Sequence, residues 1–177
     1  MTLNSGVQIV IITGSVHEGK STLAENICMK MKKEEMRVGG FLSKATFSEG
    51  NRIGYILKDV DTGESMQLAA TEPGKNTIPQ GRFHLNPAAF RYGEAIVRKC
   101  IEKEMELVVM DEIGMMEAEY KGWFNAMETV APVPCKKLWV VRQSVLEEIR
   151  HQWKVPEESV FSCKAPLEKV IYKLKSL

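Results

Sequence analysis

The chain has 177 residues, a length that fits one domain with a hydrophobic core of its own. Hydrophobic residues make up 44% and charged residues 27% of the sequence, which is ordinary for a globular protein and argues against a disordered chain, a collagen-like repeat or a membrane protein. The formal net charge of +1 gives no broad basic surface, so general nucleic-acid binding is not expected. We therefore expect one soluble domain that covers residues 1–177.

The first two elements are a strand and a helix that follow each other directly. Residues 7–12 are short and rich in β-branched side chains, and Gly6 and Gly14 bound them, as is typical of a central parallel strand covered on both faces. Residues 21–36 then predict a helix. Its apolar side chains recur at helical spacing, at Leu23, Ile27, Cys28 and Met31.

The next segments predict a second strand, a hairpin and a loop. Residues 38–44 indicate a strand, although Gly39 and Gly40 weaken the pattern. Residues 52–60 alternate in polarity, turn chemistry follows at 61–63, and residues 65–69 run back, which together predict a β-hairpin. Residues 71–81 contain two prolines and two glycines and are typical of a loop, either a plain connector or a segment that covers a site.

The second half of the chain alternates between helices and strands. Asn86 and Pro87 predict a helix start, and a strand is expected over residues 106–110. A helix around residues 120–127, a strand over 138–141, a helix behind a capping box of Ser144 and Glu147, a short strand over 160–162 and a final helix over 167–174 follow. This alternation predicts an α/β, RecA-like three-layer domain with a mainly parallel sheet and one antiparallel β-hairpin insertion.

The cysteines and the lack of targeting signals suggest where the chain works. No CxxC pair is present, so neither a zinc knuckle nor a redox motif is indicated, and reduced thiols in a cytoplasmic protein are expected. The four cysteines are Cys28, Cys100, Cys135 and Cys163. No apolar run approaches the roughly 20 residues that cross a bilayer, so no membrane partner is expected, and the oligomeric state is left open.

A phosphate-binding motif stands between the first strand and the first helix. Residues 14–22 fit the pattern G-x-x-x-x-G-K-[ST], whose glycines let backbone N–H groups point at phosphate oxygens. The predicted nucleotide-binding residues are Gly14, Ser15, Val16, His17, Glu18, Gly19, Lys20, Ser21 and Thr22. Lys20 is expected to reach the β- and γ-phosphates and the Ser21 hydroxyl to bind Mg²⁺, while His17 and Glu18 are expected to face solvent. The alternative is a glycine turn that merely caps a helix.

A pair of carboxylates follows a hydrophobic strand. We expect Asp111 to hold the metal ion, directly or through water, and Glu112 to orient or deprotonate the attacking water, so that Lys20 and Glu112 are the catalytic candidates. The alternative is that the pair only caps a strand. Residues 111–114 also satisfy DxxG, but no [NT]-K-x-D segment is present to select guanine. Arg142 lies where a strand ends and is either a γ-phosphate ligand, an ordinary surface arginine or the partner of a carboxylate.

Several segments besides the phosphate loop resemble the small thermostable nucleoside-triphosphatase family, which includes the cancer-related nucleoside-triphosphatase group. They are residues 40–43, 52–55, 81–86 with Phe90, and 111–114 with Met116 and Glu117, and they cover roughly the first two thirds of the chain. The resemblance implies a P-loop domain that hydrolyses ATP, GTP and other nucleoside triphosphates with Mg²⁺ and little base preference, with Glu112 positioning water. Residues 45–47 depart from the family's Glu-Val-Arg segment, and Met115 replaces a frequent lysine.

Three functions therefore remain for the sequence. The leading hypothesis is a nucleoside-triphosphatase. The second is a small kinase that moves the γ-phosphate to a nucleoside or other metabolite, with residues 71–82 covering an acceptor pocket. The third is an adaptor that binds a nucleotide without turnover.

Overall fold

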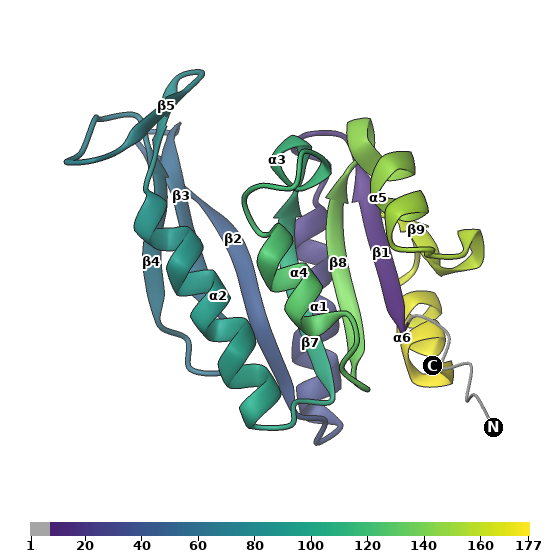
Figure 1. The fold of residues 1–177 in the computed structure, drawn as a ribbon. Helices are drawn as coiled ribbons and strands as arrows, with labels where there is room; N and C mark the ends of the chain where they lie inside the picture. The colour runs from purple at the N-terminus through teal and green to yellow at the C-terminus, as the bar shows by residue number, and fades with distance from the viewer. Residues whose placement is uncertain (1–7) are drawn as a thin grey trace.

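A computed structural model describes residues 8–177 (Figure 1). The strands are β1 (Ile9–Gly14), β2 (Val38–Ser48), β3 (Asn51–Asp59), β4 (Ser65–Ala70), β5 (Ile78–Gln80), β6 (Phe83–Leu85), β7 (Leu107–Ile113), β8 (Lys136–Arg142) and β9 (Val160–Ser162). The α-helices are α1 (Lys20–Lys33), α2 (Pro87–Glu102), α3 (Met115–Ala118), α4 (Phe124–Val130), α5 (Leu146–Gln152) and α6 (Leu167–Ser176). Short 3-10 turns occupy Gln143–Val145 and Glu157–Ser159.

The strands described over residues 8–177 form one sheet in the order β5-β6-β4-β3-β2-β7-β8-β1-β9. From β2 to β9 the neighbouring strands are parallel, and β8 lies between β1 and β7. Parallel strands end at the same edge, so the loops after β1, β7 and β8 meet there. The expected α/β fold with a parallel sheet is confirmed.

The antiparallel part of the sheet is larger than the sequence predicts. The expected hairpin of β3 and β4 is present, but β3 also pairs antiparallel with β2, and β6 joins β4 to β5. The predicted loop of residues 71–81 thus contains a strand, β5, whose Pro79 is tolerated because β5 lies at the sheet edge. This arm stands beside the parallel half in Figure 1.

Strand β2 joins the two halves because its beginning pairs with β7 and its remainder with β3. Gly40 adopts a positive φ of 102°, and a Cβ at this position would stand 2.0 Å from the carbonyl oxygen of Val109. Glycine is therefore required where β2 approaches β7 closely, and it does not weaken the strand.

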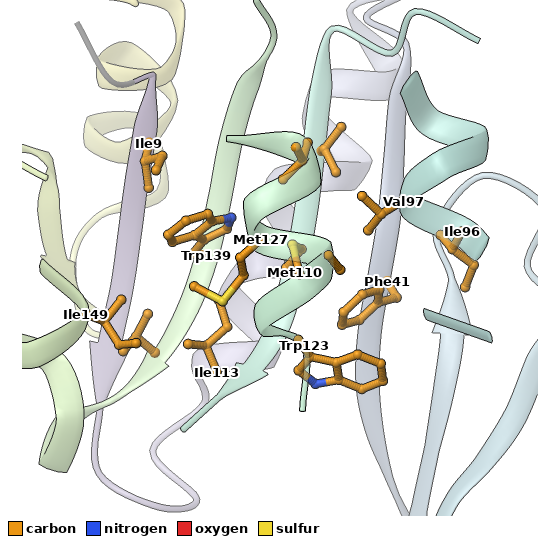
Figure 2. Close-up of a cluster of buried hydrophobic side chains, with 14 of the residues drawn as sticks. Ile9, Phe41, Ile96, Val97, Met110, Ile113, Trp123, Met127, Trp139 and Ile149 are labelled. Atoms are coloured by element: carbon orange, nitrogen blue, oxygen red, sulfur yellow. The ribbon is translucent and has the colours of Figure 1, made fainter. Parts of the chain in front are cut away.

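Helices cover both faces of the sheet and produce two hydrophobic clusters. Alternate β1 residues point to opposite faces, so Ile9 and Ile11 pack with α2, α4 and α5, whereas Val10 and Ile12 pack with α1 and α6. Figure 2 shows the first cluster, in which Trp139 and Met127 lie among aliphatic side chains. Burying each such side chain contributes about 1.5–3 kcal/mol, and the resulting layers fix the sheet edge at which the loops meet.

Two local patterns fail, and a third prediction cannot be compared with the structure. The capping box of Ser144 and Glu147 is wrong, because α5 begins only at Leu146 with no side-chain cap, after a 3-10 turn over Gln143–Val145. The helix expected around residues 120–127 begins at Phe124, since a separate short helix, α3, precedes it. Val7, the expected start of the first strand, lies outside the described residues.

All four cysteines are free and buried, as expected for reduced thiols. None of the helices of residues 8–177 combines the length and the apolar character needed to cross a membrane.

Candidate functional site

The phosphate-loop motif lies between β1 and α1. Two positions in it have left-handed backbone, Gly19 with φ 93° and His17 with φ 68°. At Gly14 a Cβ would stand 2.6 Å from the Cys163 sulfur, so a side chain there would collide with the segment after β9. The glycines thus give the loop its curvature and allow its close packing on the sheet.

The N-terminus of α1 is open for an anion. The helix has 14 residues, no side-chain cap and no acidic residue in its first turn, so its first N–H groups keep their capacity to donate. These N–H groups, together with the positive end of the helix dipole, favour a phosphate group at this end.

The loop closes on itself through two side chains. Lys20 Nζ donates to the carbonyl oxygen of Ser15 at 2.6 Å, and the Ser15 N–H donates to Glu18 Oε2 at 2.7 Å. The Ser15 N–H and the charge of Lys164 hold the pKa of Glu18 below its usual value. Glu18 is exposed, as expected, but its carboxylate also stabilises the loop by accepting the hydrogen bond from the Ser15 N–H.

Asp111 lies in β7, two residues before its end, and is fully buried. Its Oδ2 accepts from the Ser43 N–H at 2.9 Å and its Oδ1 from the Glu112 N–H at 2.7 Å. Burial, reinforced by the charge of Glu112, raises the pKa of Asp111 to about 7, and hydrogen bonds from Ser21, Ser43 and Glu112 oppose this rise. A buried carboxylate with this pKa gains from a cation beside it.

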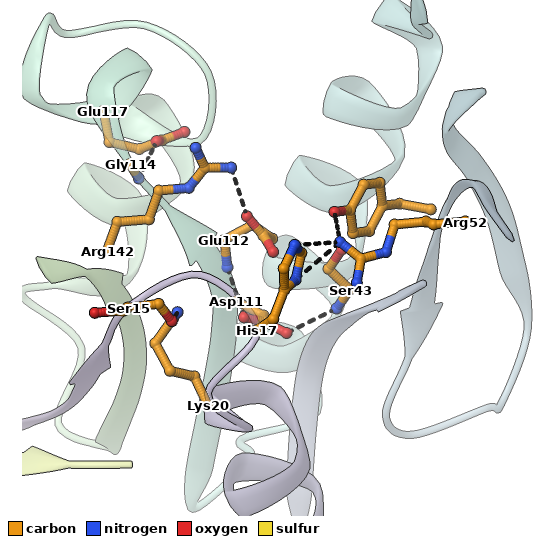
Figure 3. Close-up of polar contacts among 11 residues, drawn as sticks. Ser15, His17, Lys20, Ser43, Arg52, Asp111, Glu112, Gly114, Glu117 and Arg142 are labelled. Atoms are coloured by element: carbon orange, nitrogen blue, oxygen red, sulfur yellow. Dashed lines mark hydrogen bonds and ion pairs between the residues drawn. The ribbon is translucent and has the colours of Figure 1, made fainter. Parts of the chain in front are cut away.

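Glu112 owes its orientation to an irregularity in β7. The pairing of β7 with β8 shifts register between Met110 and Ile113, and Glu112 has a positive φ of 62°. A bulge of this kind re-aims side chains, and the left-handed conformation stores strain at the position that carries the carboxylate. Glu112 Oε2 then lies 3.0 Å from Arg142 Nη2, at the end of β8 (Figure 3).

One cavity of about 720 Å³ brings these predicted residues together. Its walls include Lys20, Ser21 and Thr22 from α1, Asp111 and Glu112 from β7, and Arg142 from β8. Val16, His17 and Gly19 of the loop also line it, whereas Gly14, Ser15 and Glu18 shape the loop from behind. Arg142, left open by the sequence, is bonded to the candidate water-positioning carboxylate.

The residues present fit a magnesium ion. Ser21 and Asp111 carry hard oxygen atoms of the kind that magnesium prefers, and the buried Ser43 hydroxyl in the same cavity has no hydrogen-bond partner within residues 8–177. In that part of the chain no group of three or more His, Cys, Asp or Glu side chains is arranged to hold a metal ion.

Two residues of the cavity were not singled out as functional by sequence reasoning. Ser43 and Arg52 both lie in segments that resemble the family, 40–43 and 52–55, and this was the available signal. Arg52, on β3, reaches across to the phosphate loop, where its Nη1 lies 2.8 Å from His17 Nδ1, and it also donates to the Tyr55 hydroxyl at 2.9 Å (Figure 3). His17 is therefore exposed but not without a partner.

The sequence matches a family described as NTPase over residues 9–162. It is 31% identical over 121 residues to the nucleoside-triphosphatase THEP1 of Methanocaldococcus jannaschii, covering 68% of this chain and 70% of that protein. It is 29% identical over 153 residues to the nucleoside-triphosphatase THEP1 of Archaeoglobus fulgidus, covering 82% and 86%. The family match continues well past Glu117, the last residue of the segments that carry the resemblance.

Solved structures share the fold. A human cancer-related nucleoside triphosphatase superimposes with a TM-score of 0.68 at 22% identity, covering 96% of this chain and 94% of that one. THEP1 from the hyperthermophile Aquifex aeolicus gives a TM-score of 0.66 at 16% identity, covering 95% of each chain. A phosphate loop on a RecA-like sheet, a buried acidic strand end and a family match over most of the chain agree, and we conclude that the chain belongs to this NTPase family.

Proposed function

We propose that this chain is a Mg²⁺-dependent nucleoside-triphosphatase that converts ATP, GTP and other nucleoside triphosphates to the diphosphate and phosphate. The observation that carries the proposal is the convergence of Lys20, Asp111 and Glu112 on one cavity at the open N-terminus of α1. The names of the curated relatives support the same reaction class.

Each residue has a role in the proposed reaction. The N-terminal N–H groups of α1 bind the phosphates, and Lys20 moves from the Ser15 carbonyl oxygen to the β- and γ-phosphate oxygens. Ser21 and Asp111 would hold Mg²⁺, which when bound offsets the charge of the phosphate oxygens. Nucleotide binding thus replaces a contact within the loop by contacts to the substrate.

The chemical step needs an oriented water molecule. Glu112 accepts a proton from the water molecule while the water oxygen forms a bond to the γ-phosphorus. The bond from that phosphorus to the β,γ-bridging oxygen then breaks, and the diphosphate leaves. Arg142 holds the Glu112 carboxylate from one side. Because Glu112 is oriented before substrate binds, little reorganisation accompanies the reaction.

The test is phosphate release from ATP, GTP, CTP and UTP with and without Mg²⁺. Glu112→Gln should retain nucleotide binding and lose about 10²–10⁴-fold in rate, the contribution of a positioned acid or base. Lys20→Ala should lose both binding and release. Glu128→Gln and Lys33→Ala, exposed positions on α4 and on the far end of α1, are the matched controls and should behave as wild type.

Binding of nucleotide without phosphate release from any of the four triphosphates would contradict the proposal and favour an adaptor. Phosphate release that persists in Glu112→Gln would show that another residue orients and deprotonates the attacking water.

A further inference from the structure

The cavity continues beyond the residues that the hydrolysis reaction uses. Its second part, here called the aromatic compartment, is enclosed by the antiparallel arm, α2 and the segment before α4. The side chains that define it are Tyr55, Leu68, Phe83, Leu85, Phe90 and Trp123. The whole cavity, at about 720 Å³, falls in the upper part of the ~300–1,000 Å³ range of small-molecule sites.

The strand order places this compartment past the γ-phosphate. Lys20 and the metal-binding pair bind the β- and γ-phosphates, so the terminal phosphate faces Asp111 on β7. Strands β3, β4 and β6, which carry most of the compartment, lie beyond β7, whereas β1 and β9 lie on the other side of β8. The ribose and base of the substrate leave from the opposite end of the triphosphate, so the compartment is free for a second molecule.

The walls suit a flat apolar ring. Tyr55 and Phe83 stand edge to face with ring centroids 5.4 Å apart, and Phe90 packs on the buried Trp123 at 4.6 Å. These packed rings are held by the core on one side, since Trp123 also contacts Phe41 at 4.6 Å. Rigid aromatic walls of this kind bind ring systems by stacking with little loss of conformational entropy.

Two arginines bring positive charge to the cavity, and one of them, Arg52, lies between the aromatic compartment and the phosphate loop. Arg52 bonds to His17 of the loop and to Tyr55 of the compartment, and within residues 8–177 its buried Nε has no hydrogen-bond partner. Arg82 lies with its guanidinium 4.8 Å over the Phe83 ring. Both arginines line the cavity, and an unused guanidinium N–H there favours a phosphate or carboxylate oxygen.

The carboxylates of the cavity are hydrogen-bonded or ion-paired, which weakens their repulsion of an anion at this position. Glu117 accepts from the N–H groups of Gly114 and Trp123, and Glu112 is paired with Arg142. The acidic groups of the cavity are thus engaged by donors, and the free donor capacity is at Arg52.

We infer that the aromatic compartment binds a nucleoside monophosphate, with its base among the aromatic rings and its phosphate at Arg52, and that this phosphate accepts the γ-phosphoryl group. This inference rests on the proposed function, because it requires the triphosphate on the phosphate loop. An oxygen of the monophosphate forms a bond to the γ-phosphorus while the bond to the β,γ-bridging oxygen breaks, and two nucleoside diphosphates result. The attacking oxygen is already ionised, so no proton has to be removed by Glu112.

Hydrolysis needs Glu112 as a base whereas transfer to a monophosphate does not, and the experiment uses this difference. Glu112→Gln, incubated with Mg²⁺, ATP radiolabelled on its γ-phosphate and AMP, GMP, CMP or UMP, should form labelled diphosphate from at least one monophosphate while releasing little free phosphate. Calorimetry should show that monophosphate binding to wild type persists when a non-hydrolysable ATP analogue saturates the phosphate loop.

Two variants test whether phosphoryl transfer depends on the aromatic compartment. Phe83→Ala and Arg52→Gln should each lower transfer, relative to hydrolysis by the same protein, by about tenfold or more, as expected for loss of a stacked ring or of a charge-assisted contact. Tyr172→Ala and Arg98→Gln, exposed positions on α6 and α2, are the matched controls and should leave the ratio unchanged. Two independent variants keep the test decisive if one folds poorly.

The inference is overturned if no monophosphate gives a labelled diphosphate, or if the monophosphates only displace the ATP analogue. Failure of the ATP analogue itself to bind wild type would instead contradict the proposed function.

Discussion

Asp111 and Glu112 are neighbours in the chain, yet both line the same cavity. In a regular strand they would point to opposite faces of the sheet. The register shift in β7 and the left-handed backbone of Glu112 remove this conflict, so that one carboxylate is buried beside Ser21 while the other remains beside Arg142. The strained backbone of Glu112 therefore places its carboxylate in the cavity where the proposed reaction needs it.

Arg142 is expected to act through Glu112 as a positioning residue. Arg142→Ala should lower kcat by about a hundredfold, the cost of misplacing a reacting group by about an ångström, while the Kd for nucleotide changes little. Arg142→Lys should recover part of the rate, since it restores a positive charge near the carboxylate. Steady-state assays of phosphate release measure kcat, and calorimetric titration measures the Kd for nucleotide.

Arg150→Ala is the matched control, because Arg150 also forms ion pairs but lies on α5 outside the cavity. A larger change in nucleotide affinity than in kcat for Arg142→Ala would instead indicate that Arg142 binds the phosphates directly.

Among the elements, the turn from β7 into α3 and α4 carries much of the site. The buried Glu117 carboxylate accepts from the Gly114 N–H and the Trp123 N–H, both at 2.7–2.8 Å, and so joins the end of β7 to the start of α4. The same turn places Trp123 against Phe41 and Phe90. One acidic side chain thus links the acidic strand end to the aromatic compartment.

Glu117 gives a prediction about stability and pH. Glu117→Ala should lower the free energy of unfolding by about 1–3 kcal/mol, because it leaves buried N–H groups without an acceptor. Burial raises the pKa of Glu117 above 4.5, so the folded state binds its proton more tightly than the unfolded state. The stabilisation from this proton is complete below pH 4.5 and is lost as the pH rises through the folded-state pKa.

Glu117→Gln carries no titratable proton and should lack this component. The stability of wild type relative to Glu117→Gln should therefore fall as the pH rises from 4.5, measured by urea unfolding at several pH values. Glu119→Gln, an exposed neighbour, is the control. An unchanged difference between wild type and Glu117→Gln across this range would show that Glu117 has the same pKa in both states.

At the scale of the whole molecule, ligand binding should stabilise the fold through the phosphate loop. A non-hydrolysable triphosphate with Mg²⁺ at a hundred times its Kd should add about 2.7 kcal/mol, which for a chain of this size raises Tm by about 5–10 °C. Lys20→Ala should lose most of this shift, whereas Lys33→Ala should retain it. An equal shift in Lys20→Ala, measured by calorimetry, would place the nucleotide elsewhere.

The sequence by itself determined the features whose causes are local. The strand, the glycine loop and the helix of residues 9–33 follow from β-branched runs, glycine spacing and helical periodicity, and the structure confirms all three. The two acidic residues near the end of β7 were located for the same reason, since a hydrophobic run that is followed by two carboxylates is visible in the sequence. The final helix and β9 were also placed correctly.

Tertiary structure decided what depends on pairing between distant segments. The strands β2 to β6 form an arm because each edge pairs with the next, and the short β5 with its proline carries no strand pattern of its own. The capping box failed because the backbone after β8 continues into a 3-10 turn before α5 can begin. Arg52 meets His17, 35 residues earlier, only after β3 has paired with β2. Short-range periodicity reports how a segment buries its own side chains, whereas the walls of the cavity are set by which strands lie side by side, and that choice is made by the sheet as a whole.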